Sequence, residues 1–522
     1  MLRNLARKSW VVTLSAGLCA FSLWSTVAVA GTPTPAAAQS LRDQVEAWRK
    51  THERQIVGEF SDFLALPDVA TNVPDIEANA KVLVKMVEAR GLKARILSAG
   101  PGTPPAVYGE LKVQGAKRTV VYYAHYDGQP VTPSQWRSPP FTPVMRDGPD
   151  GKDVDWRAST GPLDPEWRLY GRGAGDDKDS EEAILSALDA LKAAGRSPSV
   201  NVKLFFDGEE EQGSPHIEAI LRANKDLLKS DLWIIGDGPV HQTRRPLLFF
   251  GARGDTALEM TVYGPIKAMH SGHYGNWVPN PAVMAAEIVA SLRDSEGKIL
   301  VPGYSDHVRP LTPAEVQALA ALPDAETGLK QELEIGRSEG TERLGDSLMR
   351  PAINIRGIST GRVGAEAANA IPVDAKVSMD LRLVPDQTPE EARARIEAFL
   401  KSQGYTLVDH EPSAAERMAA PKLVRVQWES GYPAWRTDMS LPVSKAVIAA
   451  ADRAAGQQVI IQPMLGGSVP MYLFADVFKT PVIGVPIANH DDNQHAHDEN
   501  LRLQNLWDGI ETYSGLIGDL DW

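Results

Sequence analysis

Histidine and acidic residues recur in this sequence just after short apolar runs, where they could bind a metal ion or move a proton. In the glycine-rich stretch Gly171–Lys178, glycines let the backbone turn sharply, so the carboxylate of Asp176 can point into a cleft. His125 and Asp127 lie two residues apart, a spacing that places side chains of a strand on the same side. We therefore expect Asp127 to hold the ring of His125 in place. By itself, each segment is more typical of a polar surface loop than of a functional site.

Further carboxylates favour a metal-binding interpretation. Three consecutive glutamates, Glu209–Glu211, follow the apolar run 200–206, and acids clustered in this way repel one another unless a cation neutralises them. Asp237 follows another run, and one histidine of the segment 493–501 could complete a site. Histidine and carboxylate ligands suit zinc or another divalent ion. The number of carboxylates suits two ions about 3.5–4 Å apart that share one carboxylate and activate a water molecule.

The apolar runs predict a buried β-sheet that positions these residues. Residues 119–124, 200–206 and 232–235 are short and largely apolar, as strands covered on both faces are. Helical patterns separate them, including one that begins after Lys178 and ends near Gly195. This order predicts an α/β fold with a mainly parallel sheet. Functional residues of such sheets gather beyond the carboxyl ends of the strands, where the candidate ligands stand.

The pattern changes after residue 250. Thr256–Tyr263 and Lys376–Leu383 alternate as strands do, whereas Pro281–Leu292 and the segment from Thr388 to about Leu400 are helical in pattern. These segments predict a small α+β domain inserted into the α/β domain. The α/β pattern then resumes near Ser413, and the proline- and glycine-punctuated residues 300–350 carry no prediction.

Length and charge limit the class of protein. A chain of 522 residues is long enough for two domains, and 43% hydrophobic and 23% charged residues are typical of a soluble globular protein. The formal net charge is −13, and no lysine- or arginine-rich run offsets it. Nucleic-acid binding is therefore not expected.

The N-terminus resembles a secretory signal peptide. Three basic residues precede an apolar run from Trp10 to about Trp24, and Ala28–Ala30 has the small-x-small form of a cleavage site. An uncleaved membrane anchor is the alternative, but the apolar run is short. We expect removal of residues 1–30 and a periplasmic or secreted protein without a membrane span. The mature chain would lack cysteine, because Cys19 is the sole one.

Seven motifs in order are similar to those of the di-zinc metallopeptidase family of carnosinases, bacterial dipeptidases, glutamate carboxypeptidase and aminoacylase (clan MH). They are Ala124–Val131, Gly171–Lys178, Gly208–Ser214, Met269–Gly275, Leu381–Pro385, Leu465–Ser468 and the segment around His495. The resemblance covers nearly the whole mature chain. It implies a catalytic domain at residues 31–250 and 413–522, with an inserted lid and dimerisation domain at residues 251–412.

The resemblance also implies the ligands of two zinc ions per subunit, with Mn²⁺ or Co²⁺ as alternatives. One ion would be held by His125, Asp176 and Asp237. The other would be held by Asp176, Glu211 and His495, with Asp176 as the bridge. Glu210 would be the general base that deprotonates the water held between the ions and later protonates the leaving amine.

Residues of other segments would complete the active site. In the family, the inserted domain dimerises, and its His270 would stabilise the oxyanion in the partner subunit. Arg382 and the loop that contains Gly467 and Ser468 would help to hold the substrate. The catalytic residues expected from the resemblance are thus Glu210, His270 and Asp127.

The chain departs from the family pattern at two positions. Asp179 stands where the family usually has glycine, and we expect it to favour the first turn of the following helix. Asp498 stands where the family usually has asparagine, and the neighbouring His497 competes with His495 as a ligand. The spacing of the motif favours His495.

These features predict a di-zinc hydrolase that cleaves peptide bonds of dipeptides or short peptides. An amidase or deacylase of N-acyl amino acids is the alternative within the family. A catalytically silent binding protein is the alternative from another class, and the full set of ligands together with Glu210 argues against it.

Overall fold

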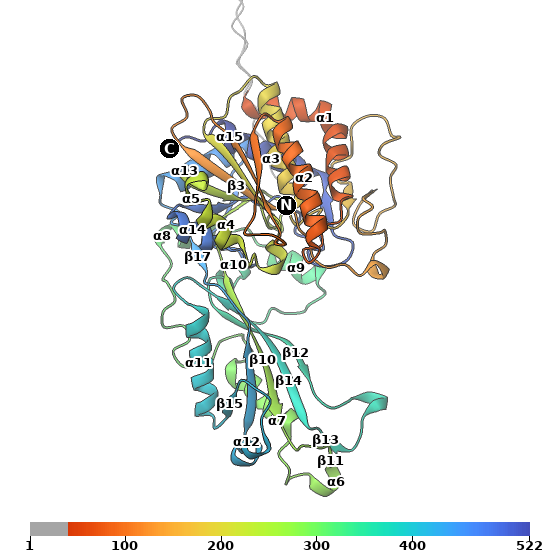
Figure 1. The fold of residues 1–522 in the computed structure, drawn as a ribbon, viewed down its shortest axis with the longest axis vertical. Helices are drawn as coiled ribbons and strands as arrows, with labels where there is room; N and C mark the ends of the chain where they lie inside the picture. Colours follow the sequence, from red (N-terminus) through yellow and green to blue (C-terminus); the bar gives the residue numbers. More distant parts are fainter. Residues whose placement is uncertain (1–39) are drawn as a thin grey trace, which may run out of the picture. The chain divides into compact units, whose positions relative to one another are not determined.

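The larger sheet of the protein has eight strands in the order β1-β2-β6-β3-β7-β19-β8-β18 (Figure 1). The computed structural model describes residues 40–522, so the predicted signal peptide lies outside the described residues. The strands are β1 (Lys93–Leu97), β2 (Ala106–Leu111), β3 (Thr119–His125), β6 (Asn201–Asp207), β7 (Leu232–Ile235), β8 (Leu247–Phe249), β18 (Ile460–Gln462) and β19 (Val482–Gly484). The middle strands β6, β3, β7 and β19 run parallel, whereas β2 is antiparallel to β6 and β8 is antiparallel to β19. The predicted parallel sheet is thus correct for the centre and mixed towards the edges.

Helices cover both faces of this sheet. In β3, Val120, Tyr122 and Ala124 face one hydrophobic cluster, and Val121 and Tyr123 face another, as the two-residue period of a strand requires. The first cluster includes residues of α1 (Leu41–Leu64), α2 (Val73–Ala89), α3 (Lys178–Ala193), α13 (Pro442–Ala455) and α15 (Leu503–Gly518). The second includes residues of α4 (Ile217–Ala223), α5 (Lys225–Leu228) and α14 (Met471–Phe478). The predicted α/β fold class is confirmed.

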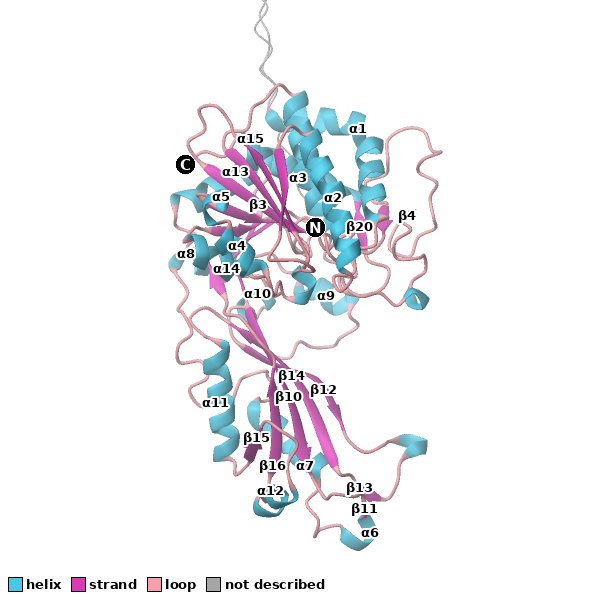
Figure 2. Cartoon of the chain, viewed as in Figure 1, coloured by secondary structure: helices cyan, strands magenta, loops and turns pink. Residues whose placement is uncertain are grey.

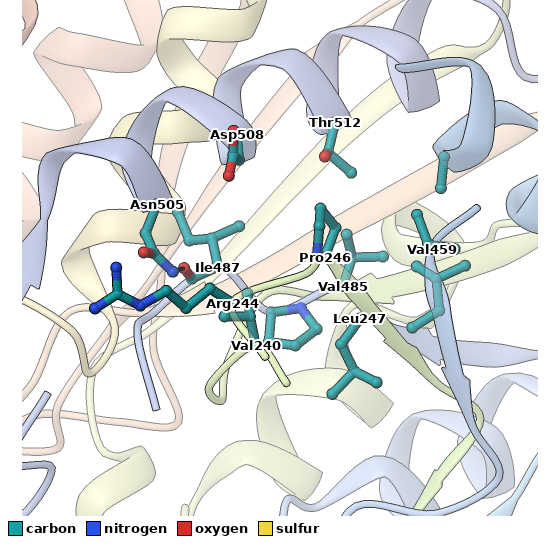
Figure 3. A pocket seen from close by; sticks show the side chains of 14 residues that line it. Val240, Arg244, Pro246, Leu247, Val459, Val485, Ile487, Asn505, Asp508 and Thr512 are labelled. Carbon is teal, nitrogen blue, oxygen red and sulfur yellow. Dashed lines mark hydrogen bonds between the residues drawn. The ribbon is translucent and has the colours of Figure 1, made fainter. Parts of the chain in front are cut away.

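A small cavity lies in the packing of α13 and α15 against the sheet. Leu247, Val459 and Val485 are among the side chains that line it, and Asn505 and Thr512 of α15 cover it (Figure 3). Its volume is about 10 Å³. Because a single water molecule needs about this much room, the cavity belongs to the core packing rather than to a ligand site.

A second sheet has five strands in the order β12-β14-β10-β16-β15 (Figure 2). It has a hydrophobic core of its own. Its strands are β10 (Gly254–Tyr263), β12 (Ala352–Ser359), β14 (Asp374–Leu383), β15 (Thr406–Val408) and β16 (Leu423–Trp428). Residues of α7 (Pro281–Leu292) and α11 (Pro389–Ser402) belong to the same core. Thr388 caps α11 by accepting a hydrogen bond from the backbone N–H of Glu391, as its position before the helix predicts.

The second sheet extends beyond the predicted domain boundary at residue 412. Strand β16 pairs with β10 over Val424–Trp428, and Val424 and Val426 are buried in the core of this sheet. The prediction that the α/β domain resumes near Ser413 is therefore wrong. Ser413 caps α12 (Ala414–Ala419), and this helix precedes β16 of the second sheet. We propose a boundary after Trp428 instead.

The remaining elements are short. They are β4 (Val144–Arg146), β5 (Arg168–Tyr170), β9 (Gly251–Ala252), β11 (Met269–His270), β13 (Ala370–Ile371), β17 (Trp435–Arg436), β20 (Asn500–Arg502), α6 (Ser271–Tyr274), α8 (Pro313–Ala321), α9 (Glu326–Glu332) and α10 (Leu344–Ser347). In the described part of the chain, single turns of 3₁₀-helix lie at Pro133–Gln135, Glu210–Gln212 and Gly364–Glu366. Within residues 40–522, no helix is both long and apolar enough to cross a membrane.

Candidate metal centre

Two groups of side chains come together beyond the ends of β3, β6 and β7. One group consists of His125, Asp176 and Asp237, and the other of Asp176, Glu211 and His495. Within each group, one potential ligand atom of every side chain lies within 4.8 Å of the others. The five residues predicted as metal ligands therefore lie together, with Asp176 common to both groups. Their binding of a metal stays a prediction.

His125 is the last residue of β3, and its side chain is fully buried. Its Nε2 atom lies 2.9 Å from Oδ1 of Asp176, and its Nδ1 atom lies 3.1 Å from the backbone carbonyl oxygen of Asp127. The nearest carboxylate oxygen of Asp127 is 3.4 Å from Nδ1. Asp127 thus contacts the His125 ring mainly through its backbone carbonyl and not, as predicted, through its carboxylate, because β3 ends at His125 and strand alternation does not reach Asp127.

The carboxylate of Asp127 has a different task, which the sequence did not indicate. Its Oδ1 accepts a hydrogen bond from the backbone N–H of Glu210, and its Oδ2 accepts one from that of Glu211, each at 3.0 Å. One side chain at the end of β3 therefore holds the turn that carries the candidate base and a candidate ligand.

The second group brings His495 to the acidic residues. Its Nε2 lies 3.0 Å from Oδ2 of Asp176 and 3.2 Å from Oε2 of Glu211. Both His495 and His497 are exposed, but only His495 belongs to one of the two groups, so the geometry favours His495 as the ligand.

Two amide side chains that the sequence did not single out also contact these carboxylates. Nε2 of Gln129 donates to Oε2 of Glu211 at 2.6 Å, and Nε2 of Gln494 donates to Oδ2 of Asp176 at 2.9 Å. Glutamine side chains are common on surfaces, so residue type alone carried no signal.

The electrostatics of the site fit a bound cation. Burial and then the charge of Asp176 raise the pKa of Asp237 to about 7, and burial holds the pKa of Glu210 well above its usual value. Burial opposes ionisation of Asp176 as well, but hydrogen bonds with His125 and His495 keep its pKa below the usual range. Oε1 of Glu211 is buried and has no hydrogen-bond partner among the described residues. Imidazole nitrogens and crowded carboxylates of this kind suit a divalent metal ion.

The predicted substrate-binding residues also lie together. Nη1 of Arg382, on β14, donates to Oγ of Ser468 at 2.6 Å, and Gly467 precedes Ser468 in the same loop. Nε of Arg253 donates to the carbonyl oxygen of Gly466 at 3.0 Å. Two arginines therefore contact the loop: Arg382 of the second sheet, which was expected, and Arg253 just before β10, which was not.

His270 is exposed on the two-stranded ribbon β11–β13. Its Nδ1 accepts a hydrogen bond from the N–H of Gly272 at 3.1 Å, and its ring packs on that of His273 at a centroid distance of 4.5 Å. In the described part of the chain, no hydrogen bond or ring contact links it to either candidate metal group. A role of His270 within its own subunit therefore has no support in these contacts.

Comparison with known proteins decides the family. A model of peptidase family M20/M25/M40 matches residues 121–519. The chain belongs to this family. The Cys-Gly metallodipeptidase dug1 of Schizosaccharomyces pombe is 28% identical over 425 residues, which are 80% of this chain and 83% of that protein. Human Beta-Ala-His dipeptidase is 25% identical over 508 residues, 93% of this chain and 94% of that protein.

Solved structures agree with the family assignment. The M20 family metallo-carboxypeptidase Sso-CP2 of Sulfolobus solfataricus superimposes with a TM-score of 0.72 at 27% identity and covers 88% of this chain and 98% of its own. Human carnosine dipeptidase 1, at 22% identity, has the same fold with a TM-score of 0.72 and covers 91% of this chain and 98% of its own. The predicted family resemblance is confirmed, and the chain is a metallopeptidase.

The predicted location of this M20 peptidase needs correction. The yeast Cys-Gly metallodipeptidases to which it is similar are cytosolic dipeptidases. The predicted signal peptide lies outside the described residues. The expectation of a periplasmic or secreted protein, which rested on a pattern of charge and hydropathy in residues 1–30, is therefore wrong.

Proposed function

We propose that this M20 peptidase hydrolyses the peptide bond of dipeptides and short peptides with two zinc ions bound around Asp176. The observation that carries the proposal is the sharing of Asp176 by two groups of potential ligands. Relatives named Cys-Gly metallodipeptidase and Beta-Ala-His dipeptidase support a dipeptide substrate. Mn²⁺ or Co²⁺ would suit the same nitrogen and oxygen ligands.

The two ions would share one ligand. His125 and Asp237 would bind the first, Glu211 and His495 the second, and Asp176 both. When bound, the ions would neutralise the crowded carboxylates, polarise the scissile carbonyl group and activate the attacking water.

Glu210 would act as the general base. It takes a proton from the attacking water and delivers it to the nitrogen of the leaving amine. Burial raises the pKa of its carboxyl group, which brings the group closer to the working range of a base near neutral pH. The carboxylate of Asp127 accepts the backbone N–H of Glu210 and so holds Glu210 in position.

Arg382, Gly467 and Ser468 would hold the substrate. A guanidinium group suits the terminal carboxylate of a peptide, because it can donate two parallel hydrogen bonds. Ser468 accepts a hydrogen bond from Nη1 of Arg382 and so orients the guanidinium.

A homodimer through the inserted domain would complete the site. Among the described residues, every large exposed hydrophobic side chain except Ile96 lies between residues 266 and 418. Exposed apolar side chains of this part of the chain are candidates for an interaction surface. In such a dimer, His270 would enter the partner's active site and stabilise the oxyanion.

Replacement of Glu210 tests the chemistry. Glu210→Gln should keep the metal content of the wild type but lower kcat by a factor of about 10²–10⁴, the usual range for a lost general base. If Glu210→Gln loses zinc while Glu211→Gln keeps it, the two roles are reversed. Dipeptides should also compete better for the enzyme than N-acetyl amino acids do, and the opposite order would favour a deacylase.

Mixed dimers test the role of His270. Dimers of His270→Ala and dimers of Glu210→Ala should each be nearly inactive. A mixed dimer has one site that combines an intact Glu210 with the intact His270 of the other chain, so isolated mixed dimers should recover part of the activity. Mixed dimers as inactive as both parents would contradict delivery of His270 between subunits.

A further inference from the structure

The loop that carries His495 has an unfavourable backbone conformation. Asn493, His495 and Asp498 have φ angles of 60°, 61° and 56°. Residues with a Cβ atom are uncommon in this left-handed region, because Cβ comes close to the following carbonyl oxygen, although Asn, His and Asp enter it more readily than other types. Three such residues in a stretch of six keep this conformation only where surrounding contacts hold it.

Three buried arginines supply such contacts. Arg146 on β4, Arg168 on β5 and Arg172 just after β5 have side chains that are 2% exposed. Each pairs with a different acidic residue of the segment 491–499. Strand β5 pairs with β20, the strand that directly follows this segment, and β4 pairs with the other edge of β5, so the three strands form one sheet.

Arg168 holds the beginning of the segment. Its Nη2 donates to Oδ2 of Asp491 at 2.6 Å, and its Nη1 donates to the carbonyl oxygen of Asp491 at 3.1 Å. The same Nη1 lies 3.0 Å from Oδ1 of Asn500, so Arg168 joins both ends of the loop.

Arg172 links the loop to the bridging carboxylate. Its Nη1 donates to Oε2 of Glu499 at 2.6 Å, and its Nη2 donates to the carbonyl oxygen of Ala496 at 3.1 Å. Oε1 of Glu499 accepts the backbone N–H groups of Gly175 at 2.9 Å and of Asp176 at 3.1 Å. Glu499 thus fixes the distance between the backbone of Asp176 and the loop of His495.

Arg146 holds the left-handed Asp498. Its Nη1 lies 3.6 Å from Oδ1 of Asp498, which also accepts the backbone N–H of Arg137 at 3.0 Å. The guanidinium group of Arg146 is fixed in turn, because it lies over the ring of Tyr170 at 4.1 Å.

We propose that Arg146, Arg168 and Arg172 form an arginine clasp that sets the affinity of the metal site containing His495. The clasp rests on the proposed function, since it acts on a ligand of the second ion. Its members are positioning residues: they hold the loop in the conformation in which Nε2 of His495 already lies 3.0 Å from Asp176 and 3.2 Å from Glu211. A loop released from the clasp would have to be ordered when the metal binds, which weakens binding.

Substitution of Asp498 should disturb the fold least, because its side chain is 21% exposed and the family usually has asparagine at this position. Asp498→Asn keeps an acceptor for the N–H of Arg137 but removes the charge opposite Arg146. Calorimetric titration of the metal-free Asp498→Asn protein with Zn²⁺ should show one site of unchanged affinity and a second site weakened roughly tenfold. Asp498→Ala should weaken the second site further. Both losses should stay within the 10–100-fold range known for residues that hold metal ligands in place. At saturating zinc, kcat of Asp498→Asn should return close to the wild-type value.

A second buried ion pair provides the matched control. Nε of Arg436 lies 2.6 Å from Oε1 of Glu315, and the two side chains are 2% and 4% exposed. Glu315→Gln should lower the unfolding midpoint without changing either zinc affinity.

The outcomes separate the clasp from the proposed function. The clasp is overturned if both Asp498 variants bind two zinc ions as tightly as the wild type, or if Glu315→Gln weakens the second site equally. A wild-type chain that binds fewer than two zinc ions would overturn the two-metal function itself.

Discussion

The carboxylate of Asp127 should be required for turnover, although we do not expect it to touch substrate or metal. It accepts the backbone N–H groups of Glu210 and Glu211, each at 3.0 Å. In Asp127→Asn, the amide offers one oxygen and one NH₂ group, so one of the two N–H groups loses its acceptor. The turn would then move away from the position that Glu210 needs.

The size of the effect follows from the lost hydrogen bond. A buried donor left without an acceptor costs about 1–3 kcal/mol. If the unpaired donor raises the free energy of the transition state by this amount, kcat of Asp127→Asn falls by a factor of about 5–150. Asp127→Ala leaves both donors without an acceptor and should lower kcat further.

Steady-state kinetics with a dipeptide, together with metal analysis and urea unfolding, check this prediction. Asp231→Asn is the matched control, because Oδ2 of Asp231 accepts the backbone N–H of Thr119 at 2.8 Å at the opposite end of β3. The control should lose stability but keep kcat. Wild-type kcat in Asp127→Asn, or an equal loss in Asp231→Asn, would refute the reasoning.

Three further results are expected. His495→Ala should lower the zinc content at one site, whereas His497→Ala should not, and elemental analysis that shows the reverse would exchange their roles. Burial raises the pKa of Glu182 to about 8, so the stability contributed by its protonated form is lost as pH rises through about 8. The unfolding midpoint should therefore fall as pH rises from the ordinary pKa of 4.5 to about 8, and Glu182→Gln should reduce this fall; an unchanged pH dependence would count against it. Removal of metal by a chelator should lower the unfolding temperature, because crowded carboxylates then repel one another; calorimetry that shows no change would contradict a resident ion.

Several elements could be predicted from the sequence because local features decide them. Strand β7 (Leu232–Ile235) and helix α7 (Pro281–Leu292) have the predicted bounds. Proline is favoured at the first position of a helix, and Asn280 caps α7 by accepting the N–H of Ala282 at 3.0 Å. The position of acidic residues after apolar runs likewise indicated where side chains would meet, since parallel strands end at one edge of the sheet.

The tertiary structure decided which groups actually contact one another. Membership of β16 in the second sheet depends on its pairing with β10, which its own alternation cannot specify. The choice between His495 and His497 depends on a loop of left-handed residues, where no strand or helix period applies.

The hydrogen-bond partners that hold the site could not be predicted from the sequence, for the same reason. The link between Asp127 and the N–H groups of Glu210 and Glu211 spans 83 or more residues, and the pair of Arg172 with Glu499 spans 327. Residue type and spacing indicate what a side chain can bind. Only the folded chain brings donors and acceptors so distant in sequence within hydrogen-bonding distance.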